Sequence, residues 1–316
     1  MRLFDAATTR KFLPWPALID ALREMFRVGC TTPLRQHHEI EVPGEPVGTL
    51  LLMPAWVPGD VLGVKVVGVM PGNAARGLPS VMSNYLLSDA RTGELLALID
   101  GAELTSRRTA AASALAASQL ARPGATRLLI VGTGQLAMRM AAAHAAVRPL
   151  CDVEVWGRRA SRAEIVAEGI RRELGIAATA VTDLASAVAR ADIVSTVTLS
   201  TEPLVQGEWL RPGTHLDLVG AFRPEMRECD DAAVSRATVF VDTREGACRE
   251  GGDLVQALAS GALTNDRIAA DLAELSRGNH PGRRDDTEIT LFKSVGVALE
   301  DLAAARLLWQ GASARS

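Results

Sequence analysis

A glycine motif lies near the middle of the chain, between an apolar stretch and an alanine-rich one. The motif fits G-x-G-x-x-A and consists of Gly132, Thr133, Gly134, Gln135, Leu136 and Ala137. Residues 127–131 before it have the composition of a strand, and residues 135–147 have that of a helix. In this context the glycines let a pyrophosphate approach the backbone N–H groups at the helix N-terminus. The motif therefore predicts a dinucleotide site, and the alternative is a strand–helix turn without a ligand.

The end of the next predicted strand, residues 153–158, indicates which dinucleotide binds. A site for NAD usually has an acidic residue there, which binds the ribose 2′-hydroxyl. This chain has Arg158 instead, with Ser161 shortly after it, and both side chains suit a 2′-phosphate. The alternative is that Arg158 and Arg159 are solvated arginines at the start of a helix. We predict that NADP(H) is favoured over NAD(H).

The elements that would position this site alternate between strands and helices from residue 127 onward. Further apolar strands are expected at 177–182, 192–198, 215–220 and 237–242, and further helices at 162–174 and from Leu184. Apolar strands that alternate with helices predict a parallel sheet covered on both faces. The predicted fold class is therefore α/β, with a Rossmann-type doubly wound parallel sheet. Three residues at strand ends are further candidates for cofactor binding: Thr198, Val219 and Gly220.

The rest of the chain has a different pattern. We expect helices at 15–28, 103–121 and 295–309, and a hairpin at 84–100 with its turn at 89–93. These elements predict a discontinuous α+β domain made of residues 1–118 and 294–316, to which the family resemblance described below assigns substrate binding and dimerisation. The Rossmann domain would span residues 119–293. The length of 316 residues also favours two domains, since single cores stop growing near ~250–300 residues.

The composition limits the partners and the compartment. A net charge of −3 gives no electrostatic reason to expect nucleic acid or an anionic membrane. The four cysteines are far apart and lack ligand spacing, so we expect neither a disulfide framework nor a metal site. No apolar stretch approaches the ~20 residues that cross a bilayer, and the N-terminus lacks the pattern of a signal peptide. We expect a cytoplasmic protein.

Several segments outside the glycine motif resemble the ornithine cyclodeaminase/mu-crystallin family. The resemblance extends from about Arg35 to Trp309 and depends on four segments: 51–56 (LLMPAW), 63–73 (GVKVVGVMPGN), 104–117 (LTSRRTAAASALAA) and 290–309 (TLFKSVGVALEDLAAARLLW). It implies hydride transfer between a nicotinamide and the Cα of a small imino or amino acid, by an enzyme that is generally a homodimer. The family includes ornithine and lysine cyclodeaminases, some alanine dehydrogenases, and ketimine reductases.

The resemblance assigns three cations of this sequence to the substrate carboxylate: Arg35, Lys65 and Arg108. A guanidinium matches a carboxylate in bidentate fashion, and Lys65 would also donate or accept a proton. Lys65 is conspicuous without the family because valines flank it within residues 61–69. It is either an edge residue facing water or a functional ammonium. Ser80 takes a position where the family often has a hydroxyl near the substrate or cofactor, and a plain surface serine is the alternative.

Two positions differ from ornithine cyclodeaminases. Those enzymes have a Glu before the L-M-P motif and an Asp within V-G-G-D-x-P, where this chain has Leu51 and Phe222. Without these carboxylates, the cationic side chain of a diamine would be buried without a partner. The segment around Phe222, GAFRPEMRECDD, resembles the mu-crystallin branch, whose activity is reduction of cyclic ketimines. We therefore predict an imine reductase with Phe222 at the substrate, unless Glu225 or Glu228 replaces the missing acids.

Three other functions are kept as alternatives. Ornithine cyclodeamination and an alanine dehydrogenase-like activity use the same cofactor chemistry. A binding protein that holds NADP and a small molecule without turnover is an alternative of another class. The complete set of Arg35, Lys65 and Arg108 favours catalysis, because a pure binder needs no carboxylate clamp beside a nicotinamide. The sequence leaves the ring size of the substrate and the direction of the reaction open.

Overall fold

The computed structural model describes residues 1–314 and contains two compact units. The first unit comprises residues 1–109 together with the C-terminal segment from Val297 onward, and the second unit comprises residues 110–296. Within the described residues, no helix is long and apolar enough to cross a bilayer.

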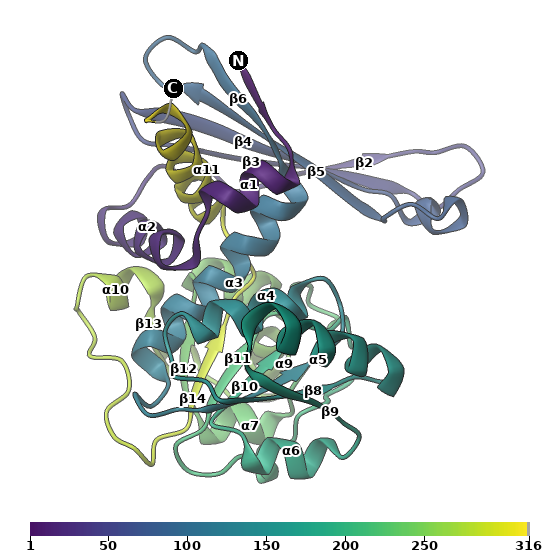
Figure 1. Ribbon diagram of the computed structural model, residues 1–316, viewed down its shortest axis with the longest axis vertical. Helices are drawn as coiled ribbons and strands as arrows, with labels where there is room; N and C mark the ends of the chain where they lie inside the picture. The colour runs from purple at the N-terminus through teal and green to yellow at the C-terminus, as the bar shows by residue number, and fades with distance from the viewer. Residues whose placement is uncertain (315–316) are drawn as a thin grey trace. The chain divides into compact units, whose positions relative to one another are not determined.

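The second unit is built on a parallel sheet of eight strands (Figure 1). The strands are β7 (Arg127–Val131), β8 (Asp152–Trp156), β9 (Ala177–Val181), β10 (Ile193–Thr196), β11 (His215–Leu218), β12 (Thr238–Val241), β13 (Ile268–Asp271) and β14 (Thr290–Lys293). Their order is β13-β12-β14-β11-β10-β7-β8-β9, and every neighbouring pair is parallel. The chain order reverses between β7 and β10, as in a doubly wound sheet. The predicted Rossmann-type α/β fold is confirmed.

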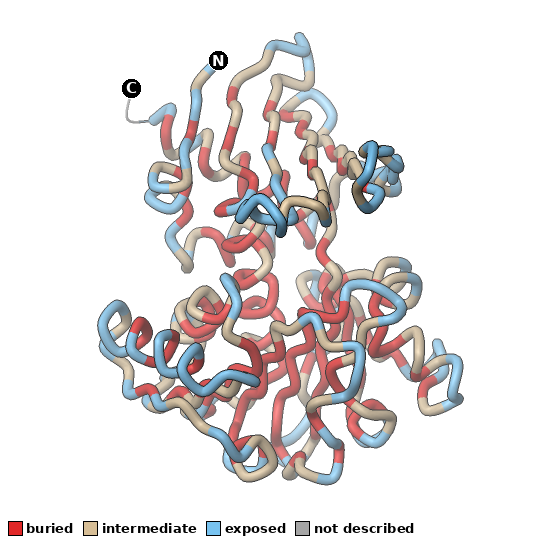
Figure 2. Tube along the Cα trace, turned by 90° about the vertical axis from the view of Figure 1, so that its right-hand side faces the viewer, coloured by how far each residue is buried: buried red, intermediate tan, exposed pale blue. Residues whose placement is uncertain are grey.

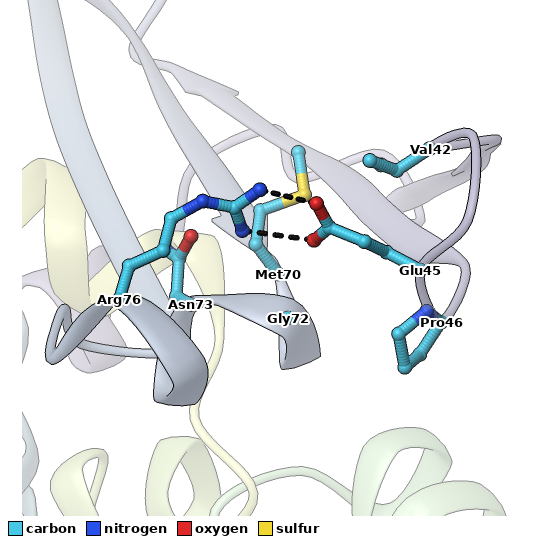
Figure 3. A pocket seen from close by; sticks show the side chains of 7 residues that line it. All are labelled: Val42, Glu45, Pro46, Met70, Gly72, Asn73 and Arg76. Carbon is cyan, nitrogen blue, oxygen red and sulfur yellow. Dashed lines mark hydrogen bonds and ion pairs between the residues drawn. The ribbon is translucent and has the colours of Figure 1, made fainter.

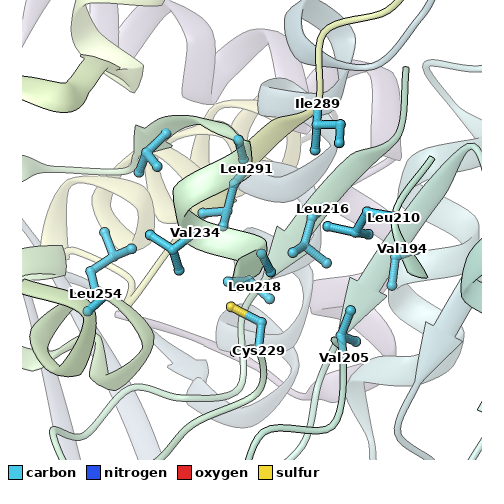
Figure 4. Packing of buried hydrophobic residues seen from close by; sticks show 14 of the residues in the cluster. Val194, Val205, Leu210, Leu216, Leu218, Cys229, Val234, Leu254, Ile289 and Leu291 are labelled. Carbon is cyan, nitrogen blue, oxygen red and sulfur yellow. The ribbon is translucent and has the colours of Figure 1, made fainter. Parts of the chain in front are cut away.

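Helices cover both faces of this sheet (Figure 1). They are α4 (Leu136–Ala145), α5 (Ala160–Leu174), α6 (Leu184–Arg190), α7 (Asp231–Arg236), α8 (Arg244–Glu250), α9 (Gly252–Ser260) and α10 (Leu272–Ser276), with short 3₁₀ turns η2 (Gly207–Trp209) and η3 (Asn265–Arg267). All residues of β10, β11 and β14 are buried, which explains the continuous apolar runs in the sequence (Figure 2). Val194, Leu216, Leu218 and Leu291 belong to one core cluster (Figure 4).

The first unit is a six-stranded sheet in the order β1-β6-β5-β4-β3-β2. Its elements are β1 (Arg2–Phe4), α1 (Ala6–Phe12), α2 (Trp15–Val28), β2 (Gln36–Ile40), β3 (Gly48–Trp56), β4 (Val61–Val69), η1 (Pro71–Arg76), β5 (Val81–Asp89), β6 (Leu95–Asp100) and α11 (Ala298–Ser313). Helix α11 packs against α2 and against β3, β4 and β5. Helix α3 (Gly101–Leu120) begins in the first unit and continues into the second. The predicted hairpin is the antiparallel pair β5–β6.

Two predictions near the C-terminus were wrong in detail. The helix expected at 295–309 begins only at Ala298, because Gly296 adopts a left-handed φ of 79° that ends the preceding loop, and it continues to Ser313. Residues 290–293 form β14, which lies between β11 and β12 and was not predicted as a strand. Four residues after a long loop give too short a pattern for that assignment, and β13 was missed for the same reason.

Candidate functional site

Lys65 lies on β4, an inner strand of the first unit, and its side chain is only 3% exposed. Side chains alternate between the two faces of a strand. Val61, Gly63, Lys65 and Val67 are the buried positions of β4, which is one of the strands that α11 contacts. The structure therefore excludes the alternative of an edge lysine facing water.

An ion cluster surrounds the Lys65 ammonium. Lys65 Nζ lies 2.7 Å from Oδ2 of Asp301, and Oδ1 of Asp301 accepts a hydrogen bond of 3.0 Å from Nε of Arg108. Arg108 Nη1 donates a second hydrogen bond, of 2.6 Å, to Oε2 of Glu300. Both carboxylates are fully buried, and Arg108 is 5% exposed. We call these four residues the first-unit ion cluster.

Glu300 and Asp301 were missed by reasoning from the sequence. They lie in the first turn of α11, where the positive end of the helix dipole favours carboxylates. Adjacent acids within the apolar run ALEDLAAARLL were the available signal, because buried carboxylates require cations as partners. Only the folded chain identifies those cations as Lys65 and Arg108.

The charges of the cluster perturb its titration. Burial lowers the pKa of Lys65 from 10.5 to about 8; Asp301 opposes this decrease, whereas the positive charges of Arg108 and Arg35 add to it. Burial alone would raise the pKa of Asp301, but Arg108 and Lys65 hold it below its ordinary value. The cluster thus combines the cations Lys65 and Arg108 with the carboxylates of Asp301 and Glu300, and the charge of Arg35 also acts on Lys65. Such a group suits the binding of one substrate carboxylate.

Arg35 and Ser80, the other residues predicted in this unit, lie nearer the surface. Arg35 is half-buried immediately before β2, and its charge acts on Lys65 as described. Ser80 is exposed immediately before β5, and its carbonyl oxygen accepts a hydrogen bond of 2.7 Å from the Met70 N–H. The structure thus relates Arg35 to the cluster by charge and does not place the Ser80 hydroxyl in it.

A pocket of about 200 Å³ lies beside η1 and the turn between β2 and β3 (Figure 3). The Arg76 guanidinium and the Glu45 carboxylate form an ion pair across it, with an Nη1–Oε2 distance of 2.8 Å. It is lined by Val42, Glu45, Pro46, Met70, Gly72, Asn73 and Arg76. None of the predicted site residues lines it, so we assign the chemistry to the ion cluster and not to this pocket.

In the second unit, the predicted cofactor residues converge where the strand order reverses. Gly132 follows β7 and Thr198 follows β10, its neighbour in the sheet, whereas Val219 and Gly220 follow β11. Nucleotides bind at this reversal point in doubly wound sheets, outside the carboxyl ends of the strands. The sheet order therefore brings together residues that are far apart in the sequence.

The loop between β7 and α4 fits a dinucleotide pyrophosphate. Gly132 has a φ of 130°, and a Cβ there would meet the Val197 carbonyl oxygen at 2.8 Å. A Cβ on Gly134 would meet nothing within 4 Å, so the space in front of the loop is open. No side chain caps α4, whose first backbone N–H groups are therefore available to an anion. Thr133, Gln135 and Leu136 complete the loop, and Gln135 is exposed.

The Glu228 carboxylate binds the ends of two neighbouring strands, β10 and β11. Its buried carboxylate accepts hydrogen bonds from the backbone N–H groups of Thr198, Gly220 and Ala221, and from the hydroxyls of Thr196 and Thr198. These hydrogen bonds disfavour the alternative that it substitutes for a cyclodeaminase carboxylate. Glu225 is exposed, with an oxygen 3.9 Å from the Arg223 guanidinium.

The remaining predicted residues of the second unit are exposed. Arg158 follows β8, and Ser161 lies in the first turn of α5, so both are at the edge where a 2′-phosphate would bind. Phe222 is 40% exposed and follows Gly220 and Ala221 after β11. The Arg223 guanidinium lies 6.0 Å from the centroid of the Phe222 ring, and contact of Phe222 with the substrate stays a prediction.

Comparison with known proteins agrees with this geometry. The family model described as "Ornithine cyclodeaminase/mu-crystallin family" matches residues 7–316. The chain belongs to this family.

Two relatives and one solved structure are similar to this chain over most of their length. The Δ(1)-pyrroline-2-carboxylate reductase of Paracoccus denitrificans is 43% identical over 93% of this chain and 91% of its own. The ketimine reductase mu-crystallin of Rattus norvegicus is 38% identical over 83% of this chain and 80% of its own. The solved Thermococcus litoralis Δ(1)-pyrroline-2-carboxylate reductase, in complex with NADH and L-proline, is 35% identical with a TM-score of 0.93, covering 100% of this chain and 98% of that one.

Proposed function

We propose that this protein reduces Δ(1)-pyrroline-2-carboxylate, a five-membered cyclic imino acid, to proline with NAD(P)H. The observation that carries the proposal is the first-unit ion cluster, in which a buried lysine with a lowered pKa shares the Asp301 carboxylate with the buried Arg108 guanidinium. The predicted class, a nicotinamide-dependent oxidoreductase acting on an imino or amino acid, is confirmed by the relatives. The ring size is inferred from those reductases.

Each residue of the cluster has a distinct part in this reaction. Arg108 and Arg35 bind the substrate carboxylate, which fixes the orientation of the C=N bond. The loop of Gly132–Leu136 would hold the dinucleotide, which when bound would supply the hydride that the Cα receives. Lys65 gives a proton to the imine nitrogen, so that one hydride and one proton convert C=N into CH–NH. A lysine whose pKa is about 8 is a better acid at neutral pH than a solvated lysine.

Ornithine cyclodeamination is disfavoured by the same residues. Leu51 lies on β3 opposite Val67, and Phe222 carries no charge, so neither can pair with a second ammonium. The Glu228 carboxylate is already occupied by its hydrogen bonds. A diamine would bring an uncompensated charge, which costs several kcal/mol.

The decisive experiment is an assay of purified protein with Δ(1)-pyrroline-2-carboxylate and NADPH or NADH, following loss of absorbance of the reduced cofactor and formation of L-proline. A panel of six-membered cyclic ketimine acids, and pyruvate with ammonia, tests ring size and alanine dehydrogenase activity. Turnover of ornithine with NAD⁺ to proline and ammonia near one per second would contradict the proposal. Binding of both ligands without turnover would instead identify a non-catalytic binding protein.

NADPH is the proposed physiological cofactor, and the relatives support only the coarser assignment to nicotinamide dinucleotides. The proposal depends on Arg158, which stands where an acid would repel a 2′-phosphate. Arg158→Asp should invert the preference in titrations with NADPH and NADH. Tenfold tighter binding of NADH than of NADPH by the unmodified protein would exclude it.

A homodimer formed through the first unit is the proposed assembly. The face of its sheet opposite the buried Lys65 positions is also apolar and only partly buried, at Leu52, Leu62, Val64, Val66 and Leu86. A solvent-facing side of an antiparallel sheet is normally polar, so this face suits a second copy of the same chain. Light scattering at micromolar concentration should give twice the chain mass, and Val64→Lys should give a folded monomer. A monomeric unmodified protein would contradict the assembly.

A further inference from the structure

The two oxygens of the Asp301 carboxylate contact two different cations. Oδ2 lies 2.7 Å from the Lys65 ammonium, and Oδ1 accepts the hydrogen bond from Nε of Arg108. Within residues 1–314, Asp301 is the ion-pair partner of Lys65. The three charged groups come from three elements: β4, α3 and α11. One carboxylate thus connects the proton donor and the carboxylate-binding group of the proposed reaction.

Without a contact of this kind, the Lys65 side chain would not be restricted to one conformation. A lysine side chain has many rotamers, and ordering it costs conformational entropy. Its burial further disfavours the charged form. The start of α11 favours a carboxylate at this place, and Arg108 keeps Asp301 ionised. The geometry therefore supplies a fixed anion directly beside the ammonium.

We propose that Asp301 is a positioning residue of this enzyme, which acts through Lys65: it holds the ammonium protonated and directed, while its other oxygen orients Arg108. This inference rests on the proposed imine reduction and adds to it a group that does not itself touch the substrate. Glu300, the adjacent residue, has a different part, because its Oε2 forms an ion pair of 2.6 Å with Nη1 of Arg108.

The charges that face Lys65 predict the direction of the effect. Arg108 from α3 and Arg35 from the segment before β2 disfavour its protonation, and Asp301 from α11 favours it. The hydroxyl of Tyr85, which lies opposite Lys65 on β5, is fully buried and neutral, because burial raises its pKa well above 10. In Asp301→Asn the attraction is lost while the burial and the two positive charges remain. The pKa of Lys65 should then fall below about 8.

Side-chain NMR tests this without any turnover, because the chain contains only Lys11, Lys65 and Lys293. Protein with ¹³C-labelled lysine gives three Cε signals, which Lys65→Arg and Lys11→Arg assign. In Asp301→Asn the titration midpoint of Lys65 should move down by at least one pH unit, a tenfold loss of proton affinity. The Lys293 signal should stay in place, since its partner is Asp253. An unchanged Lys65 midpoint would overturn the proposal.

Kinetics and two further variants complete the test. The pH at which kcat/KM declines should fall with the Lys65 midpoint in Asp301→Asn. In the matched control Glu300→Gln, KM should rise, whereas the titration midpoint of Lys65 should stay within a few tenths of a pH unit of its value in the unmodified protein. A shift of that midpoint as large as in Asp301→Asn would overturn the specific role of Asp301. If Asp301→Asn does not fold, Asp301→Glu decides: it should keep Lys65 protonated at neutral pH and lower kcat, because the longer side chain displaces the ammonium. Full kcat in Asp301→Glu would count against a positioning role of Asp301.

The failure of this inference can be told apart from the failure of the proposed function. Absence of imine reduction in the unmodified protein would refute the proposed function, whereas the NMR titration would still decide whether Asp301 controls the protonation of Lys65.

Discussion

Each unit of this protein buries one lysine against one aspartate, yet the two pairs have different surroundings. Lys65 pairs with Asp301 at 2.7 Å in the first unit, and Lys293 pairs with Asp253 at 3.0 Å in the second. All four side chains are at most 3% exposed. Arg108 and Arg35 act on Lys65 together with Asp301, whereas Lys293 stands among the carboxylates of Asp253, Asp242 and Glu228.

The two lysine–aspartate pairs also differ in the hydrogen bonds that backbone N–H groups donate to the nearby carboxylates. Oδ1 of Asp253 accepts hydrogen bonds from the N–H groups of Glu228 and Cys229, and the carboxylate of Asp242 accepts those of Val295 and Gly296. These acids therefore hold loops at the strand ends. The Lys65 pair instead lies beside the Arg108 guanidinium, which we propose binds a substrate anion. The proposed roles of the two lysines therefore differ with the groups around them and not with their burial.

The largest effects are expected when each of the two buried lysines is replaced. Lys65→Met should reduce imine turnover by roughly 10²–10⁴-fold, because it removes the proton donor, and should leave a folded protein in which Arg108 still compensates Asp301. Lys293→Met should instead lower the free energy of unfolding by about 3–5 kcal/mol, because it leaves buried carboxylates without a cation. Initial rates and chemical denaturation of both variants measure the two effects. A stable Lys293→Met or an active Lys65→Met would contradict the division of roles.

A smaller effect is expected from the guanidinium of the first-unit ion cluster. Arg108→Ala should raise KM for the imino acid by roughly 10- to 150-fold, since a charge-assisted hydrogen bond contributes ~1.5–3 kcal/mol. The matched control is Arg107→Ala, because Arg107 is equally buried but donates to the Leu13 carbonyl oxygen at 2.9 Å. It should lose stability with KM almost unchanged. Equal KM values for the two variants would remove Arg108 from the substrate site.

The acid-rich surroundings of Lys293 can be tested at Glu228. Glu228→Gln should weaken binding of NAD(P)H by about tenfold, because a neutral amide is a poorer acceptor for the Thr198 and Gly220 N–H groups. Affinity for ADP-ribose, which would use the Gly132–Leu136 loop, should stay within about twofold. Calorimetric titration of both ligands gives the two values. A parallel loss for ADP-ribose would indicate general unfolding of the sheet edge.

The smallest expected effect is the pH dependence of the unmodified enzyme. The pKa of Lys65 lies at about 8, so the protonated donor predominates below that pH and disappears above it. Because the proton-donating form is required, kcat/KM should decrease as the pH rises and reach about half its plateau near pH 8. A profile measured from pH 6 to 10 checks the sign. A rate that increases through this range would assign Lys65 as a base.

Local patterns in the sequence were sufficient for the elements and for the dinucleotide loop. The helix predicted at 15–28 is α2, and the glycines after β7 lie where the strand order reverses. Hydrophobic period, turn residues and the backbone freedom of glycine act between neighbouring residues, so a single sequence contains them.

The charge partners were decided only by the tertiary structure. Arg108 and Asp301 are 193 residues apart, and the strand that ends in Lys293 enters the sheet between two earlier strands. The sequence indicated only that Glu228 is an acidic residue in a loop. In the folded chain its carboxylate accepts hydrogen bonds from the N–H groups of Thr198 and Gly220, which follow two different strands. The energy of an ion pair depends on the distance between its charges and on their burial. Both quantities are set by how remote segments pack, which no local pattern contains.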